Sequence, residues 1–214
     1  NGYTLWFWQR AKGYMDAVAY SGNATAGRAV PHSLGVAPEM MWVKSRTASN
    51  QSWRVYHASL GATHGLNLNG TNAAFALNRL WNDTAPTNSS FIVGDHSSTN
   101  DSGGQYIAYL FATLAGISKV GSYTGTGSDI NVDCGFSAGA RFVLIKRIGA
   151  TGDWYVYDTL RGIVAGADPF LKLNTTDAQD AGNDGIDPLS SGFIVTSSSG
   201  NNTSGGTYIF YAIA

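Results

Sequence analysis

One short apolar stretch occurs twice in this chain, and its repetition constrains the fold more than any other feature. Tyr106-Ile-Ala-Tyr-Leu-Phe-Ala112 recurs at the C-terminus as Tyr208-Ile-Phe-Tyr-Ala-Ile-Ala214, and more loosely near the start as Tyr3-Thr-Leu-Trp-Phe-Trp8. The period is about 100 residues, which is the size of an independent domain and too long for a solenoid repeat or a propeller blade. The sequence therefore predicts a tandem duplication.

Further segments keep the same register. Met40-Met-Trp-Val-Lys44 matches Phe142-Val-Leu-Ile-Lys146, and Trp53 matches Trp154. Matches in this order predict two domains, over residues 13–114 and 115–214, and residues 1–12 are expected to be the closing strand of a preceding repeat or a linker.

The recurring segments are short, rich in β-branched and aromatic residues, and bounded by glycine, asparagine, serine and threonine. This pattern is typical of strands separated by turns, and predicts an all-β fold of two tandem, jelly-roll-like β-sandwiches. The continuous apolar runs 40–43 and 142–145 predict strands that are buried on both faces. Residues 73–80 are expected to form a short helix or strand at the rim, and residues 3–8 to pair with a sheet of this chain or of a neighbouring subunit.

Charge is scarce in this sequence. Charged residues make up 13% of the chain, against about 25% in a typical soluble domain, and the net charge is −1. Such a surface is a poor partner for nucleic acid, and no apolar segment is long enough to predict insertion into a membrane. The lone Cys134 is expected to be a small buried hydrophobe.

Several phrases taken together resemble a known family. They are Gly22-Asn-Ala-Thr-Ala-Gly-Arg28, Trp81-Asn-Asp-Thr-Ala-Pro86 and Asp153-Trp-Tyr-Val-Tyr-Asp-Thr-Leu-Arg-Gly162, together with the two closing strands. They resemble the C-terminal repeat domains of tail-fibre-like and other virion structural proteins of bacteriophages, common in marine and cyanobacterial phages. The resemblance implies a virion, extracellular setting and an adhesive or structural role, and it supplies no site residues.

No catalytic residue is predicted. A glycosidase needs two carboxylates that flank a sugar cleft, whereas Glu39 is the only glutamate and the aspartates are scattered in turn-like contexts. Gly135-Phe-Ser-Ala-Gly139 matches the nucleophile-elbow pattern, but no histidine follows Ser137, so a turn is expected there. A glycan depolymerase is therefore the least favoured function.

The candidate ligand-binding residues are one loop and one set of polar positions. Trp81 is a candidate exposed aromatic residue because Asn82 and Asp83 follow it and the second repeat lacks it; alternatively, it plugs an edge of the first repeat. His57 of the first repeat and Asp158 of the second occupy the same register position. Both are candidate ligand-binding residues, together with Arg161, which follows Asp158 by three residues. Trp53 and Trp154, which recur in both repeats, are expected to be core residues.

The most acidic stretch is a candidate metal site. Asp177, Asp180, Asp184 and Asp187 supply the oxygen ligands that Ca²⁺ prefers, although their spacing does not match an EF-hand loop. A solvated loop is the alternative interpretation, and no other cofactor is predicted.

These features together predict a structural and adhesion module of a virion appendage that binds host-surface glycan. Recognition is expected in loops that differ between the repeats, over residues 73–88 and 162–168. The alternative is a purely architectural spacer, filament or capsid-decoration domain. Low charge and uncovered apolar surface also predict a homo-oligomer, either a trimer or an open filament.

Overall fold

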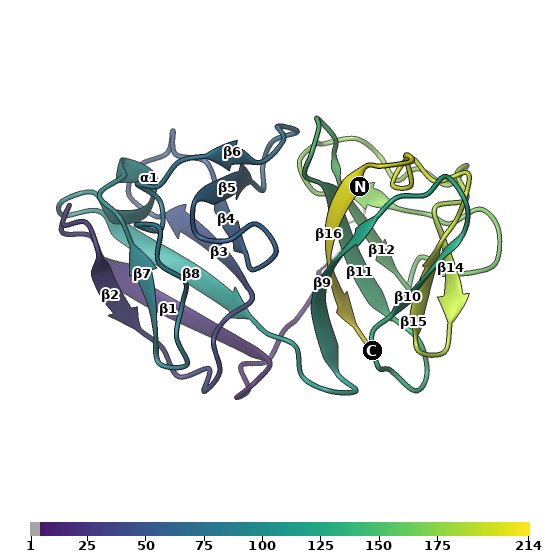
Figure 1. Cartoon of the computed structure of the whole chain (residues 1–214), viewed down its shortest axis with the longest axis horizontal. Coiled ribbons are helices and arrows are strands. Elements are labelled where there is room, and N and C mark those ends of the chain that lie inside the picture. Colours follow the sequence, from purple (N-terminus) through teal and green to yellow (C-terminus); the bar gives the residue numbers. More distant parts are fainter. Residues whose placement is uncertain (1–4) are drawn as a thin grey trace.

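The computed structural model describes residues 5–214, and antiparallel strands dominate it (Figure 1). The first half of the chain forms a six-stranded sheet, in the order β1-β8-β3-β4-β5-β6, and a two-stranded sheet of β2 and β7. Its strands are β1 (Met15–Ser21), β2 (Arg28–Pro31), β3 (Met40–Ser45), β4 (Arg54–His57), β5 (His64–Asn67), β6 (Phe75–Ala76), β7 (Ser90–Val93) and β8 (Gln105–Phe111).

The second half forms a five-stranded sheet, in the order β13-β12-β11-β16-β9, and a three-stranded sheet, in the order β10-β15-β14. Its strands are β9 (Ser118–Thr124), β10 (Ile130–Asp133), β11 (Phe142–Arg147), β12 (Trp154–Asp158), β13 (Leu171–Lys172), β14 (Ile186–Leu189), β15 (Gly192–Val195) and β16 (Thr207–Ile213).

Each half is a sandwich with its own core. In the first half, Phe91 and Val93 of β7 pack with Met41 and Val43 of β3. In the second half, residues of β10, β14 and β15 pack against β11, β12 and β16 in the same way. The outermost pairs are nested, β1 with β8 and β2 with β7, as in a jelly roll, whereas β3 to β6 follow one another as a meander. The predicted all-β fold class is confirmed.

The two halves share their strand order and their internal contacts. The order β1-β8-β3-β4-β5 corresponds to β9-β16-β11-β12-β13. Tyr20 stacks on Tyr106 with ring centroids 5.2 Å apart, and Tyr123 stacks on Tyr208 at 5.0 Å. The tandem duplication stays a prediction, and these correspondences support it.

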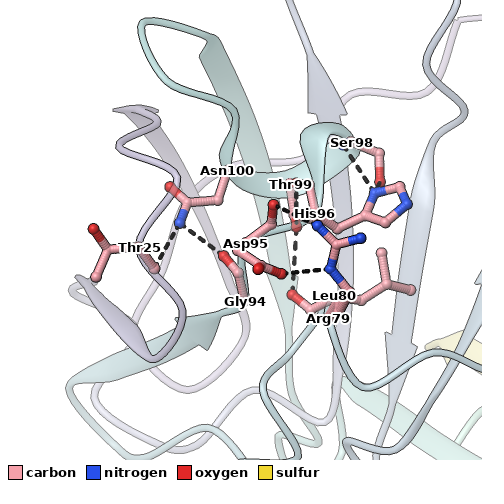
Figure 2. A network of polar contacts seen from close by, with 9 residues as sticks. All are labelled: Thr25, Arg79, Leu80, Gly94, Asp95, His96, Ser98, Thr99 and Asn100. Carbon is pink, nitrogen blue, oxygen red and sulfur yellow. Dashed lines mark hydrogen bonds and ion pairs between the residues drawn. The ribbon is translucent and has the colours of Figure 1, made fainter.

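A buried asparagine ties the loops together at the same position of each half. The Asn100 amide group donates to the carbonyl oxygens of Thr25 and Gly94, at 2.9 and 2.7 Å (Figure 2). Asn100 ends α1 (Ser97–Asn100), whose N-cap His96 accepts a hydrogen bond from the backbone N–H of Ser98. Since both carbonyls belong to loops, one side chain supplies the donors that these loops lack.

The corresponding residue in the second half is Asn202. Its amide group donates to the carbonyl oxygens of Ser128 and Thr196, at 2.8 and 2.9 Å, while its Oδ1 accepts from the backbone N–H of Thr126 at 2.9 Å. The same polar device therefore joins corresponding loops in each half.

A third apolar cluster joins the two halves, because their large sheets pack face to face (Figure 1). Met40 and Trp42 point into this cluster, whereas Met41 and Val43 point into the core of the first half. In β11, Phe142 and Leu144 point into the cluster between the halves, whereas Val143 and Ile145 point into the core of the second half. The prediction that both runs are strands buried on both faces is confirmed, and contact between the halves is the reason.

Residues 5–8 belong to no strand, so the expected pairing with a sheet of this chain is not found for them; pairing with a neighbouring subunit stays a prediction, and Tyr3 and Thr4 lie outside the described residues. The physical reason is that another strand already takes the place of a closing strand in the sheet. The place of a closing strand, between β1 and β3, is already filled by β8. Residues 73–80 contain the two-residue strand β6 followed by turns. Within residues 5–214, no helix is long and apolar enough to cross a membrane.

Candidate functional site: an aromatic cleft between the halves

Trp81 is not the exposed aromatic residue that the sequence predicts. Its side chain is fully buried in the first core, where its Nε1 donates to the backbone oxygen of His64 at 3.0 Å and its ring contacts Tyr56 edge-on. Asn82 and Asp83 are exposed, with φ of 54° and 48°, so they form the turn that lets Trp81 enter the core. The alternative interpretation, a plug in the first repeat, describes Trp81 correctly.

The four acidic residues of the candidate calcium site do not gather. Asp180 accepts a hydrogen bond from the backbone N–H of Gly182, Asp187 accepts one from Gly166, and Asp177 lies 3.6 Å from Nζ of Lys172. The backbone oxygen of Asp184 accepts from the Thr196 hydroxyl. Within residues 5–214, no group of three or more histidine, cysteine, aspartate or glutamate side chains is placed to hold a metal ion. Those aspartates instead order turns and loop ends.

Two of the three other candidates meet at the N-terminal segment. Asp158 and Arg161 form a buried ion pair, and Asp158 also accepts a hydrogen bond from Nε1 of Trp6 at 3.0 Å. The guanidinium of Arg161 lies over the Trp6 ring, 5.3 Å from its centroid. The pair therefore anchors residues 5–10 on the second half, a contact inside the chain that the sequence did not predict.

His57 is buried at the contact between the halves. It is 1% exposed, and its Nδ1 accepts a hydrogen bond from the backbone N–H of Ser59. Burial lowers its pKa to about 4, and the backbone of Phe210, in the other half, partly opposes this shift. His57 is therefore not exposed to a ligand as the sequence predicts, because the second half covers this end of β4.

This burial predicts a pH-dependent stability. Since the folded-state pKa lies below the unfolded value of ~6.5, protonation favours the unfolded chain, so stability is complete above that value and is lost as the pH falls towards 4. The expected loss is roughly 3 kcal/mol. Urea unfolding at several pH values should show it, with His57→Asn as the control. An equal loss in both proteins would assign the effect to other groups.

A cleft of ≈ 390 Å³ lies between the two halves and is lined by residues of both. Four of the six tryptophans line it, together with one tyrosine, one phenylalanine and aliphatic side chains from both halves. The lining residues are Trp6, Trp8, Trp42, Trp53, Leu68, Asn69, Tyr109, Phe142, Leu144, Val156 and Leu173. An apolar, aromatic cleft with a few polar groups is the usual form of a ligand site, so it is the strongest candidate site in the described structure.

The cleft depends on a difference between two equivalent tryptophans. The backbone N–H groups of Trp53 and Trp154 donate to the side chains of Asn69 and Asn174, at 3.0 and 2.8 Å. The Trp154 ring is fully buried, whereas the Trp53 ring is partly exposed and stacks on Tyr109, with centroids 6.2 Å apart. The prediction of a core role is therefore correct for Trp154 only.

The N-terminal segment closes one side of the cleft. The ring of Trp8 makes edge contacts with Trp42, Phe111 and Phe142, at centroid distances of 5.9, 5.9 and 5.8 Å. Trp6 contacts Phe142 from the same segment. Composition showed that aromatic residues were available, but no sequence spacing indicated that the two halves would bring them to one place.

Neither Cys134 nor Ser137 is placed to act as a nucleophile. Cys134 is buried, and burial raises the pKa of its thiol to about 12. Ser137 is exposed in a bend between β10 and β11. The turn expected around Ser137 and the buried cysteine are both found.

Comparison with known proteins gives one match. No curated protein and no solved structure matches the chain. One family model, described as "Domain of unknown function (DUF7483)", matches residues 9–214 and so spans both halves as a single unit. The chain therefore belongs to the family described as DUF7483, a domain of unknown function.

Proposed function

We propose that this chain is a structural and adhesion module of a virion appendage, and that it binds a host-surface glycan in the aromatic cleft. The observation that carries the proposal is the cleft, with its stacked pair of Trp53 and Tyr109 at the mouth. A partly exposed aromatic ring offers an apolar face to the C–H groups of a sugar ring, while neighbouring polar groups meet its hydroxyls. The virion setting rests on the sequence resemblance.

The polar contribution comes from the rim of the cleft. Asn69 is exposed there, and its Oδ1 already accepts a hydrogen bond from the backbone N–H of Trp53. This bond fixes the orientation of the amide, so that its NH₂ group is available as a donor to a ligand hydroxyl. A rigid aromatic face beside a fixed amide is a binding arrangement and supplies no nucleophile or acid–base pair.

A glycan array on the whole chain, followed by calorimetry with the best binder, tests the proposal. Trp53→Ala should lower the affinity about tenfold, because an aromatic contact contributes roughly 0.5–1.5 kcal/mol beyond the area it buries. Asn82→Gly is the matched control, because Asn82 lies in the loop that the sequence predicts to bind. Glycine readily adopts the positive φ of this position, so the fold should be kept and the affinity for the glycan should stay unchanged. Loss of binding in the control alone would move the site to that loop.

A purely architectural role is the second candidate, and the contact between the halves favours it. Corresponding positions of both large sheets belong to the one cluster between the halves, for example Met40 and its counterpart Phe142, and Val55 and Val156. The same patch of each half covers the other, as in a closed two-fold dimer, and this makes a rigid unit. Absence of any binder on the array, with an intact fold, would favour this second role.

A further inference from the structure

We propose that residues 5–8 form a docking edge for the same segment of a second copy of this chain, so that two copies pair antiparallel about a two-fold axis. The inference concerns the outward face of the segment whose inward residues, Trp6 and Trp8, line the cleft, and it does not depend on glycan binding. It begins with the alternation of this segment. Trp6 and Trp8 pack against the cluster between the halves, whereas Leu5 and Phe7 are 73% and 87% exposed.

Alignment of residues 5–8 with the closing strands β8 and β16 indicates which kind of surface each side chain of residues 5–8 would contact. Trp6 and Trp8 align with Tyr109 and Phe111 of β8, which also belong to the cluster between the halves. The two exposed residues align with Ala108 and Leu110, which lie in the core of the first sandwich. Their counterparts in β16, Phe210 and Ala212, lie in the second core.

Leu5 and Phe7 therefore occupy positions that another apolar layer covers in both halves. Within residues 5–214, the segment belongs to no sheet, so its backbone is open to pairing with another strand. An extended segment with an apolar face and an unpaired backbone is the form that strand addition uses.

The surface beside the segment is also apolar. Leu5, Phe7, the 89%-exposed Leu160 and the C-terminal Ile213 and Ala214 line one groove of ≈ 380 Å³. The groove is continuous with the contact between the halves, because Trp6, Trp8 and Phe142 line it as well. Scattered exposed apolar residues are ordinary, but a contiguous groove of this kind marks an interaction surface.

A second copy is the occupant that these features fit. Antiparallel pairing about a two-fold axis places Leu5 and Phe7 of both copies on the same side of the new two-stranded sheet, where they pack against one another, and it pairs both backbone edges in one isologous contact. The net charge of −1 on each chain gives little repulsion between copies. The pairing is closed, unlike the open filament considered from the sequence.

Light scattering of the whole chain over about 1–100 µM tests the proposal, since self-association depends on concentration. We expect a rise from 22.6 kDa towards twice that mass. Phe7→Ser and Leu5→Ser should each raise the dimer dissociation constant about tenfold or more, as expected for apolar anchors of an interface. Val36→Ser, at a 41%-exposed apolar position that does not line the groove, is the matched control and should leave the constant unchanged.

Hydrogen exchange gives a second measurement. The amides of residues 5–8 should exchange more slowly at the concentration where the dimer forms, and this protection should be lost in Phe7→Ser. A monomer at every concentration, a trimer, or a dimer unaffected by both serine substitutions would overturn the proposal.

Discussion

Trp154→Ala should lower the free energy of unfolding by about 3–5 kcal/mol, as expected when a fully buried tryptophan is truncated. The Trp154 side chain is fully buried in the cluster between the halves. Its Nε1 also donates across that contact to the backbone oxygen of Asn67, at 2.9 Å, so the substitution removes one of the two donors to that carbonyl, the other being the backbone N–H of Gly70, and leaves a cavity.

The matched control is Trp53→Ala, at the same register position of the first half. It should cost less, about 1–2 kcal/mol, because the ring is already partly exposed and loses mainly its contact with Tyr109. Urea denaturation followed by circular dichroism measures both. Equal losses would show that the two tryptophans contribute alike and that the contact between the halves adds little stability. Because Trp53→Ala stays folded, it also serves the glycan-binding test.

Asn202→Asp should be similarly severe, at about 3–5 kcal/mol near neutral pH, because it places an unpaired charge in a buried site. Asn202 is 2% exposed, and its amide group donates to two backbone carbonyl oxygens. A carboxylate at this position would face both oxygens with no proton to donate.

The equivalent substitution in the first half provides the control. Asn100→Asp should cost less, because Nη1 of Arg28 lies 3.4 Å from Oδ1 of Asn100 and would partly neutralise the new carboxylate. Asn202→Asp should also recover stability relative to the native chain as the pH falls, since burial raises the folded-state pKa of the new carboxyl above its usual ~3.9. A loss that is independent of pH, or equal at the two positions, would contradict this account.

The all-β class was predictable because its signals are local. Alternating residues and turn formers act over a few positions, and the recurring closing strand shows where a unit ends. Even the burial of β3 and β11 on both faces followed from their continuous apolar runs. What covers the second face was not predictable. An apolar run such as 40–43 indicates that both faces of the strand are covered, but it does not indicate which segment covers each face.

The candidate site was not predictable for the same reason. The rings of Trp8, Trp53 and Phe142 come from three distant parts of the chain, and they line one cleft only because the two large sheets pack face to face. Sequence context also misplaced Trp81, where polar neighbours indicated exposure although a left-handed turn carries the ring into the core. Asp158 and Arg161, predicted as ligand-binding residues, contact Trp6 of the same chain instead.

The sequence by itself thus determined the elements that short-range chemistry controls: strands, turns and the buried cysteine. Tertiary structure decided which of two equivalent tryptophans is buried and which lines a cleft. The physical reason is that the sequence pattern specifies the apolar faces of a strand, whereas exposure depends on the shape of the opposing sheet. Trp53 and Trp154 occupy the same register position and make the same type of backbone hydrogen bond, Trp53 just before β4 and Trp154 at the start of β12, yet only the Trp154 ring is fully buried.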